Sequence, residues 1–228
     1  MVSLAADEAH IWCVDLRHGA AALAACLSAD ERARVDQLTD PVDRRRFTIA
    51  RGALRRILAA YLATTADALR FTYGAHGKPA LAPGDELHFN LSHADDVACV
   101  AVSRAGALGV DVEPVRALES RDALAARFFS PRDRATLAAL PAAERDRGFW
   151  RCWTFKEAYV KALGAGVTHP LDAFDLAFSE AAPRVIAERV GPVSPWSLHA
   201  FEPAVGYVGA LAVRASAIRV CNQSWFVP

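Results

Sequence analysis

The sequence predicts an α+β protein built from two similar halves. Runs that alternate like strands and patterns of helical period both recur along the chain, and the segment after residue 164 alternates like strands. The sequence also contains a weak internal repeat, as a duplicated α+β unit would leave, with the boundary between the two copies near residues 103–107. We therefore expect an N-terminal half over residues 1–104 and a C-terminal half over 105–228. An offset of 111 maps Leu87, His88, Val97, Ala101 and Val102 onto Leu198, His199, Val208, Ala212 and Val213.

The N-terminal half should begin with a strand over residues 11–16, followed by two helices. Ser28 and Glu31 form an S-x-x-E capping box at the start of the first helix. Asp40 and Pro41 suit the N-cap and first turn of the second. Apolar residues recur with helical period along that second helix, at Phe47, Ala50, Leu54, Ile57, Leu58 and Tyr61.

The middle of the chain predicts strands and then helices. A short helix should start at Ser130, and a long one should run from about residue 142 to 163 and end at Gly164. The remainder alternates like strands. The predicted strands of the middle segment are 87–91, 97–102 and 108–112.

Composition is that of a folded globular protein, with 53% apolar and 23% charged residues. Lys plus Arg and Asp plus Glu number 26 each, so no overall field favours nucleic acid or an anionic membrane as the partner. Any anion site must be local.

The cysteines predict reduced, buried thiols. Their number is odd and no C-x-x-C pair is present for zinc or redox chemistry. The start of the chain lacks a cationic segment followed by an apolar run, and no uncharged apolar stretch reaches about 18 residues. We expect a cytoplasmic protein. The five cysteines are Cys13, Cys26, Cys99, Cys152 and Cys221.

The strand LGVDVE carries Asp111 and Glu113, whose spacing of two projects both carboxylates to one face. This arrangement suits Mg²⁺, which is usually held by one or two carboxylates together with phosphate oxygens and water. A solvated strand end is the simpler interpretation of the motif taken alone.

The helix FWRCWTFKEAYVKAL aligns Glu157 and Lys161 with Trp150 and Trp153 at spacings of three and four. A carboxylate buried against indoles needs a partner or a metal. An ordinary surface pair between Glu157 and Lys161 would also explain the spacing.

A third group of residues could bind phosphate. The strand HFNLSH delivers Ser92 and His93 to its end, and phosphate sites need several convergent donors. Both groups also have a simpler interpretation. His93 could be an ordinary hydrogen-bonded loop histidine, and the basic residues of the early helix could form a solvated face. Further basic residues are Arg44, Arg45, Arg46 and Arg51 on the early helix and Lys78 in the GKP turn.

The order and spacing of these motifs resemble those of the surfactin-type, or group II, 4′-phosphopantetheinyl transferases. The resemblance runs from about Arg44 to Gly166, and the W-x-x-K-E-A-x-x-K-x-x-G-x-G block is the most specific part. Where members of the family often have a glutamate three residues after the FFS serine, this chain has Asp133. The matching blocks are GKP, FNLSH, GVDVE, ARFFS and WTFKEAYVKALGAG.

The resemblance implies two similar α+β halves with coenzyme A in the cleft between them. It assigns Mg²⁺, with Mn²⁺ as a possible substitute, to Asp111, Glu113 and Glu157. Glu157 would be the catalytic base, and Lys161 would offset charge on the leaving group. The expected contacts to coenzyme A are Arg46, Arg51, Lys78, Pro79, Ser92, His93, Asp111, Lys156 and Lys161.

The implied reaction transfers 4′-phosphopantetheine from coenzyme A to a serine of an apo acyl or peptidyl carrier protein and releases 3′,5′-ADP. A duplicated chain would hold its whole site in a monomer. Phe128 and Phe129, with the following helix, are the candidate surface for the carrier, although both rings could equally lie in the core.

Two other functions fit some of the motifs. A noncatalytic nucleotide or coenzyme A binding module could use the same basic cleft, but it would not need Glu157 and Lys161. A Mg²⁺-dependent phosphohydrolase could use the carboxylates to activate water, but it would need no docking surface for a protein serine.

Overall fold

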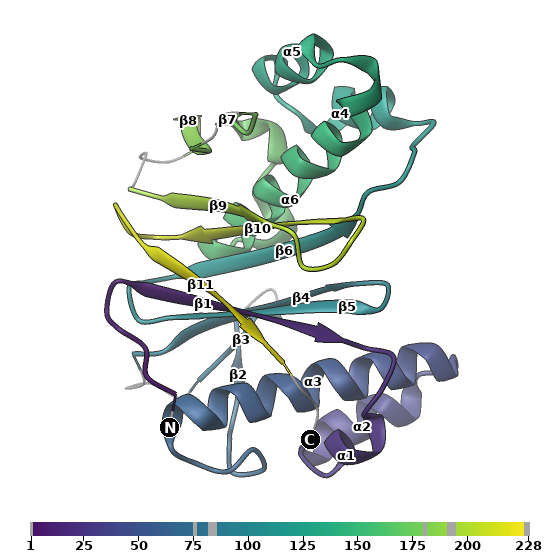
Figure 1. The fold of residues 1–228 in the computed structure, drawn as a ribbon, viewed down its shortest axis with the longest axis vertical. Coiled ribbons are helices and arrows are strands. Elements are labelled where there is room, and N and C mark those ends of the chain that lie inside the picture. The colour runs from purple at the N-terminus through teal and green to yellow at the C-terminus, as the bar shows by residue number, and fades with distance from the viewer. Residues whose placement is uncertain (1, 75–76, 82–85, 180–181, 191–194, 226–228) are drawn as a thin grey trace.

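The structure is a computed structural model that describes residues 2–74, 77–81, 86–179, 182–190 and 195–225. Two sheets are stacked with their faces together, and each has a long helix on its outer side (Figure 1). The confirmed α+β fold is thus a pair of layered units joined through their sheets.

The N-terminal unit is a four-stranded sheet in the order β11-β1-β5-β4. Both predicted helix starts are confirmed: Ser28 and Glu31 complete the capping box of α2, and the Asp40 side chain accepts a hydrogen bond from the backbone N–H of Val42 at the start of α3. The elements of this unit are β1 (Glu8–Asp15), α1 (Ala20–Ala24), α2 (Ala29–Gln37), α3 (Pro41–Leu62), the hairpin β2 (Thr72–Tyr73) and β3 (Pro79–Ala80), β4 (His88–Ala94), β5 (Val97–Ser103) and β11 (Arg219–Ser224).

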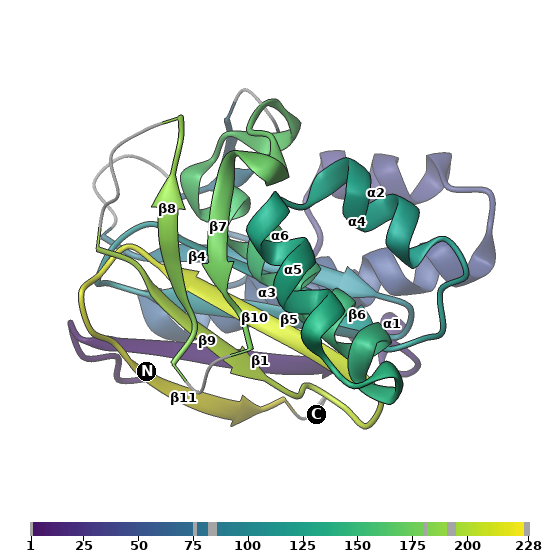
Figure 2. The same ribbon diagram turned by 90° about the horizontal axis from the view of Figure 1, so that it is seen from above.

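The C-terminal unit is a three-stranded sheet in the order β6-β10-β9, covered by α6. In Figure 2 the β7–β8 hairpin lies on the other side of α6 from α4. The elements are β6 (Leu108–Pro114), α4 (Arg121–Phe128), α5 (Pro131–Ala139), α6 (Arg145–Leu163), β7 (Phe174–Ala177), β8 (Arg184–Glu188), β9 (Ser197–Phe201) and β10 (Tyr207–Val213), with short 3₁₀ turns at Ala142–Glu144, Gly166–Thr168 and Leu171–Ala173.

The two units share one topology. In each, a first strand pairs antiparallel with the third strand of the unit, which also pairs antiparallel with the second, and the long helix lies between the first and second strands in sequence. The layer between the sheets is apolar, and its fully buried members include Ile11, Ala101, Val110 and Leu211.

Two details of the sequence prediction are wrong. The C-terminal strand β11 pairs parallel with β1, so the expected half 105–228 loses its last strand to the N-terminal sheet. The offset of 111 is also wrong by one residue where the central strands correspond. Val100 of β5 and Ala210 of β10 both face their unit's helix, whereas an offset of 111 would match opposite faces.

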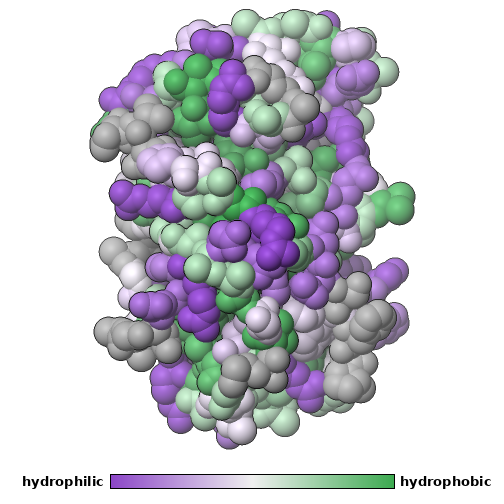
Figure 3. Space-filling model, turned by 60° about the vertical axis from the view of Figure 1, so that its left-hand side comes forward, coloured by the Kyte–Doolittle hydropathy of each residue, from purple (hydrophilic) through white to green (hydrophobic). Residues whose placement is uncertain are grey.

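One face of the molecule is mixed in polarity among the described residues (Figure 3). Hydrophilic and hydrophobic residues are interspersed over both units on the face shown in Figure 3. Within the described ranges, every helix is too short or too polar to cross a bilayer.

Candidate functional site

Asp111 of β6 lies where the two units meet. The residue is 4% exposed, and its Oδ1 accepts hydrogen bonds from Ser92 Oγ of β4 at 2.9 Å and from Lys161 Nζ of α6 at 2.6 Å. Three residues predicted from separate motifs therefore converge on one oxygen. The close approach of α6 to β6 that brings Lys161 to Asp111 requires a glycine at position 109, because a Cβ there would lie 2.1 Å from the carbonyl oxygen of Ala158 in α6.

The second oxygen of Asp111 is buried and has no hydrogen-bond partner among the residues that the structure describes. Leaving a buried charged oxygen unsatisfied is costly, and such an atom in a folded protein calls for a bound water, ligand or ion. Asp111 thus has one oxygen satisfied by the protein and one available to a cation.

Two more carboxylates, those of Glu113 and Glu157, lie close enough to Asp111 for its charge to act on them. Desolvation together with the charge of Asp111 raises the pKa of Glu113 to about 7. The same two causes raise the pKa of Glu157 above its ordinary value. Mutual repulsion among carboxylates in a partly dry site is relieved by a divalent cation, so this donor set fits Mg²⁺, which prefers oxygen ligands.

The three carboxylates are nevertheless loosely spaced. Among the described residues, only Glu8, His10 and Cys221 bring three candidate ligand atoms within 4.8 Å of one another. Direct ligation of one ion by Asp111 together with the two glutamates would therefore require side-chain movement or an intervening water.

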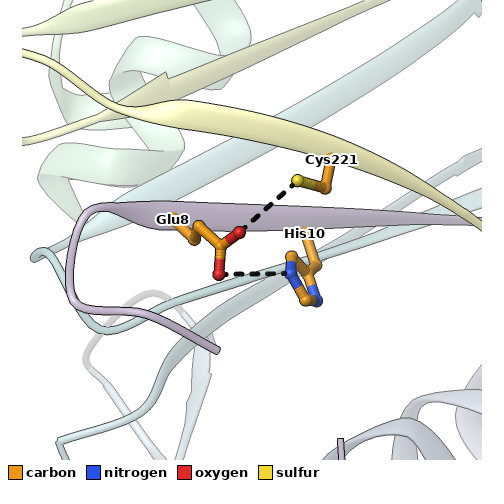
Figure 4. A group of neighbouring side chains, drawn as sticks. All are labelled: Glu8, His10 and Cys221. Carbon is orange, nitrogen blue, oxygen red and sulfur yellow. Dashed lines mark hydrogen bonds and ion pairs between the residues drawn. The ribbon is translucent and has the colours of Figure 1, made fainter. Parts of the chain in front are cut away.

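The cluster of Glu8, His10 and Cys221 lies elsewhere, where β11 joins β1 (Figure 4). Its carboxylate is already satisfied, since Glu8 pairs with Arg219 at 2.6 Å and accepts a hydrogen bond from the N–H of Ala5 at 2.8 Å. The cluster holds the C-terminal strand to β1 and does not need an ion for charge balance.

Basic groups line the rim beside Ser92. His93 is exposed, and partial desolvation together with the charges of Lys161 and Arg46 lowers the pKa of its imidazole. Arg46 of α3 pairs with Asp96 at 3.0 Å and keeps about a quarter of its side chain exposed. An anion could therefore reach both His93 and Arg46.

Lys78 joins the small β2–β3 hairpin to the C-terminal unit. Its ammonium donates to the carbonyl oxygens of Leu108 at 2.8 Å and Lys161 at 2.6 Å. Desolvation, with the charge of Lys161, lowers its pKa to about 8. Lys78 and Pro79 line a pocket of about 380 Å³ together with Leu108 and Gly164 of the C-terminal unit. Both predicted residues therefore lie at the boundary between the two units, which we call the seam.

Lys156, which was predicted to contact coenzyme A, lies in the core of the C-terminal unit. The side chain is fully buried, and its ammonium pairs with Asp133 at 2.7 Å and donates to the carbonyl oxygens of Leu171 and Phe174. Lys156 therefore stabilises the C-terminal core, and Asp133, the departure from the family pattern, is its ion partner.

Arg51 is also engaged inside a core. It is 8% exposed, pairs with Glu31 at 2.6 Å and donates to the hydroxyl of Tyr73 at 3.1 Å. Its predicted contact with the ribose phosphate would require it to leave these partners, and Arg46 is the more exposed arginine.

Asn90 is a residue that the sequence analysis missed. It is buried in β4, and its Oδ1 accepts a hydrogen bond from the backbone N–H of Val110 at 2.9 Å. This bond fixes β4 against β6 two residues before Ser92. The signal was present, since Asn90 is an amide within an otherwise apolar strand.

A pocket of about 500 Å³ opens next to Glu157 and Lys161, and it was also not predicted. Its apolar wall includes Phe128, Trp153 and Leu171. The ring of Phe128 packs edge-on against Trp153 and is partly exposed, whereas Phe129 is 2% exposed in the core. Only one of the two adjacent phenylalanines is therefore available to a ligand.

An acidic group and a set of basic donors thus face each other at the seam of a duplicated fold, which fits a protein that handles a phosphorylated ligand between its halves. Two family models match: "4'-phosphopantetheinyl transferase, N-terminal" over residues 15–105 and "4'-phosphopantetheinyl transferase superfamily" over 107–212.

Curated relatives carry the same description. The chain is 38% identical over 220 residues to the 4′-phosphopantetheinyl transferase HetI of Nostoc sp., covering 93% of this chain and 90% of that protein. It is 30% identical over 154 residues to the transferase psf-1 of Bacillus pumilus, covering 68% and 65%. It is 26% identical over 181 residues to the transferase ffp of Bacillus subtilis, covering 79% of each.

The chain belongs to the 4′-phosphopantetheinyl transferase superfamily. Enzymes of this superfamily transfer phosphopantetheine from coenzyme A to a serine of a carrier protein. Among solved structures, a Thermotoga maritima holo-[acyl-carrier-protein] synthase matches 48% of this chain and 62% of its own, with 20% identity and a TM-score of 0.40, which is too distant to bear on the site.

Proposed function

We propose that the chain is a Mg²⁺-dependent 4′-phosphopantetheinyl transferase of the surfactin type, acting on an apo acyl or peptidyl carrier protein. The observation that carries this proposal is Asp111, which joins Ser92 and Lys161 across the seam and keeps one buried oxygen without a partner. Asp111, Glu113 and Glu157 would hold the cation, with Mn²⁺ as a possible substitute.

The residues at the seam would divide the work of binding. His93 and Arg46 offer donors to the phosphates of coenzyme A from the rim, and Ser92 and Lys161 offer donors from within. Lys78 and Pro79 would line the nucleotide site. The apolar wall that Trp153 and Leu171 give the pocket beside Glu157 is suited to the pantetheine arm, which carries no charge, and Phe128 at the partly exposed edge of the pocket is the candidate contact for the carrier.

In the proposed reaction the carrier serine oxygen attacks the β-phosphorus of coenzyme A. The new Ser–O–P bond forms as the bond to 3′,5′-ADP breaks. Glu157 accepts the serine proton, a role favoured by its raised pKa. Lys161 offsets the charge that develops on the 5′-phosphate oxygen of 3′,5′-ADP as the pyrophosphate bridge breaks. Bound Mg²⁺ would supply neutralisation of the phosphate charge.

Incubation with coenzyme A, Mg²⁺ and an apo carrier protein, followed by mass spectrometry of the intact carrier, tests this function. The expected product is a carrier heavier by one phosphopantetheine group. Binding of coenzyme A without transfer would favour a binding module, and release of phosphate without carrier modification would favour a hydrolase.

Two variants test the assigned residues in that assay. Glu157→Gln and Asp111→Asn should each abolish transfer while thermal unfolding remains cooperative, because both keep side-chain volume and remove a charge. Glu119→Gln, an exposed acid outside the site, is the matched control. Transfer at the wild-type rate by Glu157→Gln would contradict its roles as base and ligand.

The assembly and location are part of the same proposal. The seam that contains Ser92, Asp111 and Lys161 is formed by one chain, which supports a monomer. Light scattering that gave a larger assembly would contradict this. We propose a cytoplasmic location because coenzyme A and carrier proteins are found there, with neither nucleic acid nor membrane as a partner.

A further inference from the structure

Cys13 and Cys99 lie directly opposite each other on neighbouring antiparallel strands, β1 and β5. Both belong to the layer between the two sheets. Opposed residues of an antiparallel pair have Cα atoms about 4.5 to 5.5 Å apart, and disulfides usually join Cα atoms about 4.4 to 6.8 Å apart. The two thiols can therefore be joined without separating the strands.

The environments of the two thiols differ. Cys13 is partly exposed and lines a pocket of about 550 Å³ beside Arg17 and Trp225, whereas Cys99 is fully buried. A hydrogen bond from Cys99 lowers the pKa of the Cys13 thiol, and burial raises that of Cys99. An accessible thiol of lowered pKa beside a buried second thiol is the arrangement typical of oxidation-sensitive cysteine pairs.

The other cysteines do not share this arrangement. Cys26 and Cys152 are buried in the two separate helix-facing cores, and Cys221 contacts Glu8 at 3.7 Å on the opposite face of β1. All five cysteines fall within the described residues, and all are free thiols.

We propose that Cys13 and Cys99 form a hydroperoxide-sensitive modification site that closes reversibly to a disulfide. The Cys13 thiolate attacks one oxygen of the hydroperoxide, the O–O bond breaks, and Cys13 becomes a sulfenic acid as an alcohol or water leaves. The Cys99 thiol then attacks the Cys13 sulfur and expels water. Two thiols lose two electrons in total, and the hydroperoxide gains them. A dithiol reductant reverses the bond.

The pair is next to the functional site. On its other side Cys99 pairs with Ser92 of β4, and Ser92 Oγ donates to Asp111. Closing the disulfide draws the sulfur of Cys99 toward Cys13 and away from Ser92, so oxidation should disturb the Ser92–Asp111 contact. This consequence for catalysis rests on the proposed transferase function, whereas the disulfide does not.

Thiol counting on the full chain tests the modification. The wild-type protein is treated with hydrogen peroxide, blocked with an alkylating reagent, unfolded and mapped without reduction. We expect a Cys13–Cys99 linked peptide and a loss of two of the five thiols, reversed by dithiothreitol. Cys99→Ala should instead leave a Cys13 sulfenic acid that dimedone traps, and the control Cys221→Ser should behave as wild type.

Three results would overturn parts of the proposal. No loss of thiols, or linkage through Cys221, would refute the site itself. Oxidation of Cys99 in Cys13→Ser at the wild-type rate would refute the role of Cys13. Linkage with an unchanged transfer rate would refute the coupling to Ser92, for which we expect a several-fold slower oxidised enzyme. If the reduced enzyme transfers nothing, the proposed function fails while the thiol result still stands.

Discussion

Substitution of Glu113 measures how much the repulsion between its carboxylate and that of Asp111 destabilises the folded protein. Its pKa is raised from 4.5 to about 7 by desolvation and by the charge of Asp111. Glu113→Gln keeps the side-chain volume and removes the ionisable group. We therefore expect the variant to be more stable than the wild type when Mg²⁺ is absent, although it removes a proposed ligand.

The magnitude follows from the pKa. One pKa unit corresponds to about 1.4 kcal/mol, so ionising Glu113 in the folded protein costs at most about 3.5 kcal/mol. The side chain is partly exposed, and solvent screening reduces the expected gain to about 1 to 3 kcal/mol. For a chain of this size each kcal/mol shifts the midpoint of thermal unfolding by about 2 to 4 °C.

The sign depends on pH. Between about 4.5 and 7 the folded wild type binds the Glu113 proton more readily than the unfolded chain, so its contribution to the free energy of unfolding falls as pH rises through this window. The gain of Glu113→Gln should consequently be small at pH 4.5 and complete at pH 8.

Thermal unfolding at both pH values, with and without Mg²⁺, is the assay. Mg²⁺ should raise the midpoint of the wild type, because a ligand bound only by the folded state stabilises it, and should raise that of Glu113→Gln far less. Glu119→Gln should stay within about 0.5 kcal/mol of wild type. A Glu113→Gln protein that is less stable at pH 8, or that keeps the full Mg²⁺ response, would refute the reasoning.

Four further variants separate binding, folding and docking. His93→Ala should weaken coenzyme A binding roughly tenfold to a hundredfold, since a hydrogen bond to a charged group contributes about 1.5 to 3 kcal/mol; calorimetry showing unchanged affinity would contradict the contact. Lys156→Met should cost about 3 to 5 kcal/mol in denaturant unfolding because Asp133 would stay buried without a partner, and a neutral effect would contradict that pairing. Phe128→Ala should raise the Michaelis constant for the carrier, and that constant should change little between low and physiological salt because apolar docking is insensitive to screening. Phe129→Ala should mainly lower stability, by about 3 to 5 kcal/mol. A steep salt dependence, together with an unaffected Michaelis constant in Phe128→Ala, would exclude this surface.

Local features of the fold were predictable because their causes are local. Ser28 and Asp40 begin helices through hydrogen bonds to residues two or three positions away. The pairing of β11 with β1 joins opposite ends of the chain, and alternation alone specifies a strand but not its neighbour. The same limit explains the offset error, because matching residues by identity ignores which face of a strand they occupy.

The candidate site divides along similar lines. Glu157 and Lys161 are four residues apart and share a helix face, so spacing places both at the seam. Lys156 is adjacent in sequence to Glu157 but about 100° away around the helix, where it meets Asp133 in the core. Arg51 is likewise turned away from Arg46 on α3. Motif membership assigned Lys156 and Arg51 to the ligand, and helix geometry assigns them to packing.

The duplication also explains why there is a single site. Aligning Val100 with Ala210 in the central strands places Asp111 at the position of Trp12, because these are their respective partners. The N-terminal unit fills that position with an indole that packs on α3. The C-terminal unit places a carboxylate there, in reach of Lys161 on α6.

The exchange is reciprocal on the second strands. Ser92, which pairs with Cys99 in the N-terminal unit, corresponds to Phe201, which pairs with Gly209 in the C-terminal unit. The Phe201 ring lies where a Cβ of Gly209 would stand, so that position is packed with apolar atoms. Each unit thus supplies one polar side chain to the site, Ser92 or Asp111. At the position equivalent to the other unit's polar residue it has an aromatic side chain, Trp12 or Phe201. Because the acid comes from one unit and the hydroxyl from the other, the two meet only where β4 and β6 touch.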